Sequence, residues 1–209
     1  MTENRLAKLR AALKEQGWDG MLVTHGPNRR YMTGFSGSAG HALVTEDEAL
    51  LFVDYRYEAQ AAQQAPSFAI VKHGHAVYAV AAEEARRRGL RRIAFEGKHL
   101  TVAGASQLRD AFGPDAELIL SEEAVERLRG VKDADEIGKL ERAVRIAEQA
   151  FVQLLEGGFV RAGVSERRAA AELEYRMRLL GADCGWHPFI VASGARSALP
   201  HGSASDKEI

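Results

Sequence analysis

The stretch that decides the fold is HALVTEDEALLFVD, residues 41–54. Two apolar runs flank the acidic tripeptide at residues 46–48, and this pattern predicts two strands joined by a short turn. Upstream, GMLVTHG at residues 20–26 predicts another short, buried strand. Further strands are expected in FAIVKHG (68–74), RRIAFEG (91–97) and AELILS (116–121).

Helices are expected before and between these strands. The first 17 residues have the pattern of an amphipathic helix, whereas Pro27 and Asn28 predict a loop. The other predicted helices cover Tyr57–Gln64, residues 77–89 and Val102–Phe112. Strands that alternate with helices form a parallel or mixed sheet covered by helices. We therefore expect a small α/β domain over residues 1–121.

The pattern changes after this domain, because residues 122–182 carry no strand signal. Asp133 and Glu136 form an acidic variant of a capping box, which predicts the start of a long amphipathic helix. Ser165 is suited to cap a second helix, and FIVASG at residues 189–194 predicts a strand. These elements open a second domain of α+β type. The expected division is a first domain over 1–121, a connecting segment over 122–135 and a second domain over 136–209.

Composition excludes several classes of protein. The chain has 209 residues and a net charge of −1, so no overall field favours nucleic acid or an acidic membrane. The N-terminus lacks the apolar region of a secretory signal, and no apolar run is long enough to span a bilayer. The single cysteine, Cys184, excludes an internal disulfide and a zinc site built from several thiolates. We expect a soluble cytoplasmic protein that binds neither nucleic acid nor membrane.

Three short motifs in the first domain could carry chemistry, and each has a structural alternative. GFSGSAG at residues 34–40 lacks the Gly-Lys-Ser/Thr ending of a phosphate loop, which favours a tight connection into the hairpin. Asp54 and Arg56 share one face at the end of a strand, where a local ion pair is expected. His73 and His75 also share a side, but two imidazoles alone make an incomplete metal site.

Two histidines near the C-terminus are candidates for a functional site. His187 precedes the last expected strand and is suited either to packing or to lining a pocket. His201 follows Pro200, which pushes Leu199 into an extended conformation and stiffens the loop. A histidine on a rigid loop at a strand end is suited to hydrogen bonding a reacting carbonyl, although a purely structural role is equally compatible with this pattern.

Several motifs, in order along the chain, resemble the creatinase/prolidase/aminopeptidase P family. YMTGFSGSAG, LFVDYRYEAQA and LRGVKDADEIGKLERAVRIAEQAF resemble the amino-terminal part of that family. GVSERRAAAELEYRMRLLGA and IVASGARSALPHG resemble the beginning of its catalytic domain. The resemblance implies an α/β creatinase-type domain with a mixed sheet, followed by an incomplete α+β catalytic domain of pita-bread fold.

The resemblance also implies an activity, namely the hydrolysis of the bond between an amino-terminal residue and a following proline. Family members use two divalent ions (Mn, Co or Zn), held by two Asp, one His and two Glu, to activate a water molecule. The histidine of the Pro-His-Gly motif, here His201, is not a metal ligand but binds the substrate carbonyl or stabilises the tetrahedral intermediate. His187 is the candidate substrate-binding residue. It stands where prolidases tend to have Phe, and this departure from the family pattern bears on the preference for proline.

The metal ligands of the family all follow the Pro-His-Gly motif, and this chain ends at Ile209. We therefore expect the chain to hold no catalytic metal, to be inactive alone, and to belong to a longer, homodimeric peptidase acting on proline-containing peptides. Two alternatives stay open. One is a non-catalytic module that binds peptides or proteins, and the other is an amidinohydrolase of the creatinase kind.

Overall fold

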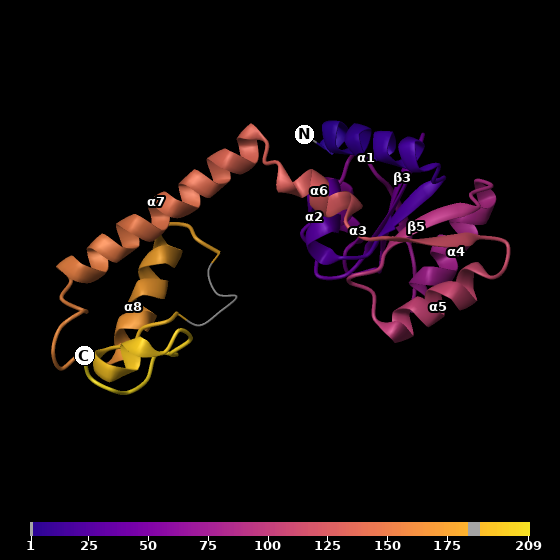
Figure 1. Ribbon diagram of the computed structural model, residues 1–209. Helices are drawn as coiled ribbons and strands as arrows, with labels where there is room; N and C mark the ends of the chain where they lie inside the picture. Colours follow the sequence, from indigo (N-terminus) through magenta and orange to yellow (C-terminus); the bar gives the residue numbers. More distant parts are fainter. Residues whose placement is uncertain (1, 184–188) are drawn as a thin grey trace. The chain divides into compact units, whose positions relative to one another are not determined.

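The computed structural model describes residues 2–183 and 189–209 (Figure 1). The chain separates into two compact units, Met1–Val131 and Lys132–Ile209. His187 and Cys184, which were singled out in the sequence, lie outside the described residues.

A six-stranded sheet in the order β4-β3-β2-β1-β5-β6 forms the centre of the first unit. β1 pairs antiparallel with β2, and β2 pairs antiparallel with β3, so the predicted hairpin is confirmed. The remaining neighbours pair in parallel, which makes the sheet mixed as expected. The strands are β1 (Gly20–Val23), β2 (His41–Thr45), β3 (Ala49–Val53), β4 (Ala69–Lys72), β5 (Arg92–Glu96) and β6 (Glu117–Ser121).

Helices cover both faces of this sheet (Figure 1). Successive strand residues point to opposite faces, so Met21 contributes to one core and Leu22 to the other. Leu9 of α1 packs in the first core, and Leu108 of α5 packs in the second. The helices of this unit are α1 (Thr2–Gln16), α2 (Gly26–Thr33), α3 (Glu58–Gln64), α4 (Val77–Arg87), α5 (Val102–Phe112) and α6 (Ala124–Gly130).

The loop expected around Pro27 and Asn28 is wrong, because these residues lie in the first turn of α2. Proline is tolerated there, since its missing N–H has no partner within the helix at that position. Asn28 is fully buried, and its side chain donates to the Glu96 carboxylate rather than terminating the helix. The helix ends at Gly34, whose φ of 80° is the left-handed conformation that favours glycine.

The second unit is helical in its described part. α7 (Ala134–Glu156) begins with the predicted capping box: Asp133 Oδ1 accepts from the Glu136 N–H at 2.9 Å, and Glu136 Oε2 accepts from the Asp133 N–H at 3.1 Å. Ser165 caps α8 (Glu166–Leu179) by accepting from the Arg168 N–H. α7 packs against α8.

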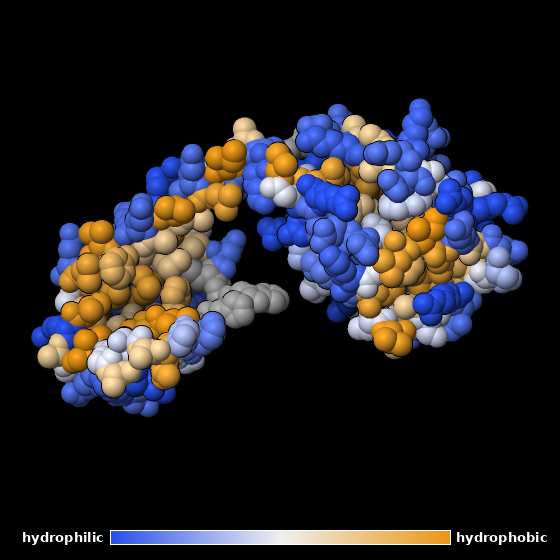
Figure 2. All heavy atoms as spheres, viewed as in Figure 1, coloured by the Kyte–Doolittle hydropathy of each residue, from blue (hydrophilic) through white to orange (hydrophobic). Residues whose placement is uncertain are grey.

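The described residues of this unit leave the outer stripe of α7 partly exposed. Ile137, Leu140, Val144 and Phe151 are each about half exposed, and Figure 2 shows apolar side chains gathered over α7 and α8 on the visible face. Among the described residues, no helix is both long enough and apolar enough to cross a membrane.

The strand expected over residues 189–194 is wrong. Ile190 forms only an isolated bridge with Ser203, and the short 3-10 helix η1 (Gly194–Ala198) follows. Among the described residues, the apolar residues at 189–192 have no neighbouring strand on which a ladder could form. The loop after η1 is instead held by side chains, as described next.

Candidate functional site

The Pro-His-Gly loop places His201 at an exposed turn of the second unit. The Gly202 N–H donates to the Leu199 carbonyl at 3.1 Å, which closes the turn around the histidine. Leu199 has φ −88° and ψ 112°, so the extended conformation expected before Pro200 is confirmed. The imidazole is therefore presented to solvent on a short, constrained loop.

Glu166, the first residue of α8, fixes the segments on both sides of this loop. Its carboxylate is fully buried and accepts from the N–H of Ser193 at 2.8 Å and from its hydroxyl at 3.0 Å. It also accepts from the N–H of Ser205 at 3.2 Å and from its hydroxyl at 2.7 Å, and from Arg196 Nε at 3.2 Å. The Ser205 hydroxyl is the main cause that lowers the pKa of Glu166 to about 2. The carboxylate is thus ionised at neutral pH, and it joins residues 193 and 205 across the loop.

Backbone hydrogen bonds hold the end of the chain along the start of α8. The Glu166 N–H donates to the Lys207 carbonyl, and the Arg167 N–H donates to the Ser205 carbonyl, each at 2.9 Å. The Ile209 N–H donates to the Val164 carbonyl at 2.9 Å. In residues 132–183 and 189–209, however, no three His, Cys, Asp or Glu side chains come together as a metal site would require. The part of the second unit that the structure describes therefore does not fit a metal centre, and we derive no catalytic step through one.

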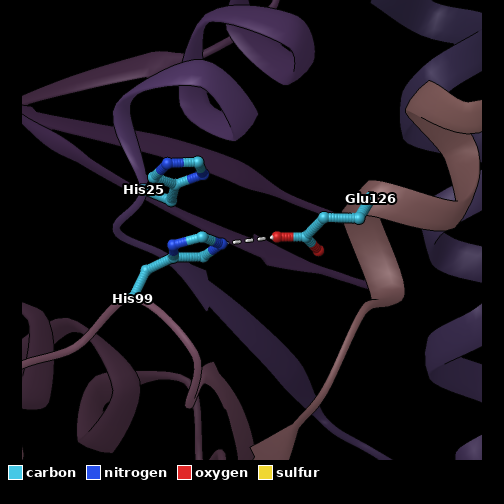
Figure 3. A group of neighbouring side chains, drawn as sticks. All are labelled: His25, His99 and Glu126. Atoms are coloured by element: carbon cyan, nitrogen blue, oxygen red, sulfur yellow. Dashed lines mark hydrogen bonds and ion pairs between the residues drawn. The ribbon is translucent and has the colours of Figure 1, made fainter. Parts of the chain in front are cut away.

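A separate cluster of ionisable side chains lies in the first unit (Figure 3). His25 follows β1 and occupies the N-cap position of α2 without a side-chain capping hydrogen bond, and His99 follows β5. Because β1 and β5 are parallel neighbours, their carboxyl ends lie at the same edge of the sheet. Glu126, from α6, completes the cluster. One atom from each of the three side chains can be chosen so that all three lie within 4.8 Å of one another.

The two imidazoles of this cluster stack on each other. Their ring centroids are 3.5 Å apart and their planes differ by 3°. His99 Nε2 lies 3.0 Å from Glu126 Oε1. Burial lowers the pKa of His25, and the neighbouring His99 lowers it further. Burial raises the pKa of Glu126, but hydrogen bonds from Asn28 and His99 outweigh this effect and the pKa is lowered overall.

A network of buried hydrogen bonds holds the segments that carry the cluster. Glu96, at the end of β5, is 3% exposed. It accepts from the N–H groups of Thr24 at 2.5 Å and His25 at 2.6 Å. The Asn28 amide donates to Glu96 Oε1 and to Glu126 Oε1, each at 2.7 Å, and its own oxygen accepts from Arg129 at 2.6 Å. The position of Glu126 is thereby fixed by α2 as well as by its own helix.

The other motifs proposed from the sequence have structural roles. Arg56 donates from Nε and Nη2 to the two oxygens of Asp54, at 3.0 and 2.7 Å, so the predicted local ion pair is confirmed. Residues 34–40 connect α2 to β2, and Arg29 holds them by donating to the carbonyls of Gly37 and Gly40. His73 is exposed and its ring contacts the Gly74 carbonyl.

The sequence did not identify His25, His99, Glu126 or Glu166 as site residues. For the histidines a signal existed, because each follows a strand, but it required the knowledge that these two strands are neighbours. For the glutamates no signal existed, because an acidic residue near the start of a helix is also what the helix dipole alone favours. Their burial is a tertiary property.

The mixed sheet, followed by a helical unit with a Pro-His-Gly loop, defines the class of creatinase- and prolidase-like proteins. The chain belongs to this family: residues 5–131 match the Creatinase/Prolidase N-terminal domain, and residues 138–209 match Metallopeptidase family M24. The α/β fold class and the family expected from the sequence are thus confirmed.

Known relatives are similar along nearly the whole chain. The Xaa-Pro dipeptidase from Bacillus anthracis is 40% identical with a TM-score of 0.92, and the match covers 100% of this chain and 58% of that one. The X-Pro aminopeptidase from Thermotoga maritima is 34% identical with a TM-score of 0.87, covering 98% and 57%. The uncharacterized peptidase YqhT from Bacillus subtilis is 44% identical over 205 residues, which are 98% of this chain and 57% of the relative. The chain therefore spans less than two thirds of the length of these relatives.

Proposed function

We propose that this chain forms part of a metal-dependent peptidase that hydrolyses the bond between an amino-terminal residue and a following proline. The observation that carries the proposal is the similarity to an Xaa-Pro dipeptidase over all 209 residues. The boundaries predicted from the sequence are proposed to divide the chain by function into a creatinase-like domain over 1–121, a connecting segment over 122–135 and the first part of the peptidase domain over 136–209.

In this proposal His201 is a catalytic residue. Its exposed position on a loop fixed by Glu166 supports the role, because a hydrogen-bond donor aimed at developing charge must be held in place before the reaction. The imidazole would donate to the substrate carbonyl oxygen as that oxygen gains charge. His187 is proposed to line the substrate pocket.

The two divalent ions are proposed to bind residues that this chain does not supply. The 209-residue chain alone is then expected not to hydrolyse peptides. The active protein is proposed to be a cytoplasmic homodimer with about the length of its relatives.

The test uses the protein extended along its reading frame to the length of the relatives, assayed on an Xaa-Pro dipeptide and on creatine with and without manganese. We expect manganese-dependent hydrolysis of the dipeptide alone. His201→Ala should lower kcat by about 10²–10³-fold, the usual effect of removing one transition-state donor. The metal content, measured by mass spectrometry, should not change. His73→Ala is the matched control, because it removes another exposed imidazole.

Other outcomes would identify the alternatives. Metal-independent hydrolysis of creatine would replace the peptidase by an amidinohydrolase. Binding of the dipeptide without turnover would indicate a non-catalytic module. Hydrolysis by the 209-residue chain itself would show that the assignment of the metal ligands to other residues is wrong.

A further inference from the structure

We propose that His25, His99 and Glu126 bind one divalent transition-metal ion of the zinc class on the first unit (Figure 3). The three side chains come from three different elements, and each offers a donor atom of the kind that zinc prefers. The proposal concerns the first unit alone and does not depend on peptidase activity.

The donors lie close together, but the rings must reorient before they can share one ion. Zinc binds imidazole nitrogen and carboxylate oxygen at about 2.0–2.2 Å, so neighbouring donors in a tetrahedral site lie about 3.3–3.5 Å apart. His99 Nε2 and Glu126 Oε1 are already 3.0 Å apart. All three donors lie within 4.8 Å, and the stacked rings must tilt toward a shared ion. Rotation about the side-chain bonds of the partly buried His25 and the exposed His99 would supply this movement.

His25 has an unused donor atom in this cluster. Its Nδ1 is buried and makes no hydrogen bond with any described residue. A buried polar atom without a partner costs free energy, and an ion would supply that partner. We assign Nδ1 as the His25 ligand.

The surroundings hold the third ligand and provide a favourable charge. The Asn28 amide fixes Glu126 Oε1 at 2.7 Å, as hydrogen bonds commonly fix carboxylate ligands of metals. Glu96 and Glu126 contribute two negative charges, and Arg129 contributes one positive charge through its contact with Asn28. These three groups sum to −1, which favours a cation.

The donor set selects the kind of ion. Two imidazoles and one carboxylate suit Zn²⁺, Co²⁺ or Ni²⁺, whereas Mg²⁺ and Ca²⁺ prefer oxygen ligands. Three protein ligands leave a fourth position for water. The ion would join the ends of β1 and β5 to α6, the helix that directly precedes the second unit. We therefore expect the bound ion to stabilise the packing of α6 against the sheet.

The test titrates the untagged 209-residue chain with Zn²⁺ by calorimetry and with Co²⁺ by visible absorption. We expect one ion per chain, a tetrahedral Co²⁺ spectrum and a rise in the melting temperature of the first unit. In ¹⁵N-detected spectra of the histidine rings, Nδ1 of His25 and Nε2 of His99 should shift on addition of Zn²⁺. Mg²⁺ should cause none of these changes.

Variants then locate the site. The double change His25→Ala/His99→Ala should weaken Zn²⁺ binding by more than about 100-fold, the upper range for loss of a supporting group alone. Glu126→Gln keeps the shape of the side chain and should weaken Zn²⁺ binding less than the double variant does. It is the alternative test if the double variant does not fold. The matched control is His73→Ala/His75→Ala, which removes two imidazoles elsewhere in the same unit. Absence of saturable one-to-one binding at micromolar Zn²⁺, binding unchanged in the first variant, or binding lost in the control would each overturn the proposal.

Discussion

Glu96 is the residue whose replacement tests most directly how the first unit is held together. Its carboxylate accepts from the N–H groups of Thr24 and His25 and from the fully buried amide of Asn28. Glu96→Leu keeps the apolar stem and removes all of these acceptors. The two backbone groups lie on half-buried residues that water partly reaches, so each loss costs about 1 kcal/mol, and the buried amide adds about 1–2 kcal/mol. We expect a total loss of about 3–4 kcal/mol in the free energy of unfolding.

Glu96→Gln separates the hydrogen bonds from the charge. Its amide oxygen still accepts from the backbone, but its NH₂ group faces the NH₂ group of Asn28. We expect the free energy of unfolding to fall by about 1–2 kcal/mol, which is less than in the leucine variant. The control is Glu117→Leu on β6, where the side chain is 63% exposed and the expected change is within about 0.5 kcal/mol.

The assay is urea unfolding followed by the fluorescence of Trp18, which packs against the core of the first unit. A Trp186→Phe background removes the other tryptophan, so that the signal reports this unit alone. If Glu96→Leu lowers the free energy of unfolding by less than about 1 kcal/mol, or by no more than Glu117→Leu does, the buried carboxylate does not organise the β1–α2 turn.

Three further predictions concern other parts of the chain. Burial lowers the pKa of His41 from 6.5 to about 4, so between these pH values the unfolded state binds more protons than the folded state. The free energy of unfolding should therefore fall by up to about 3 kcal/mol as the pH drops from 6.5 to 4. Urea titrations at each pH should show that His41→Phe removes this pH dependence. Gly40→Ala should cost about 1–3 kcal/mol by thermal unfolding, because φ is +135° and the new Cβ would lie 2.9 Å from the Phe52 carbonyl, whereas Gly74→Ala meets nothing within 4 Å and should be neutral. Leu140→Glu should reduce concentration-dependent self-association in light scattering, since this side chain is 56% exposed on the outer stripe of α7; an unchanged mass distribution would exclude that stripe as the contact.

Elements whose signals are local could be predicted from the sequence. The hairpin over residues 41–54 has two apolar runs around an acidic turn, and the capping box at Asp133 lies within four residues of sequence. In both cases the groups that decide the structure are close in the chain. α2 was missed because Pro27 and Asn28 are loop formers by preference, and only the tertiary partner of Asn28 shows why a helix is stable there.

The candidate sites differ from these elements because their decisive contacts are distant in sequence. Glu166 lies 27 residues from Ser193 and 39 from Ser205, so no short motif reveals that its carboxylate fixes the loop of His201. Glu126 lies 98 residues from Asn28. The Pro-His-Gly motif identified His201 as a candidate, but no motif identified the Glu166 carboxylate that fixes its loop. A candidate histidine can be identified from a motif, whereas the buried carboxylate that fixes its loop must be seen in the folded chain, because only burial distinguishes that carboxylate from the many solvated glutamates of a charged helix.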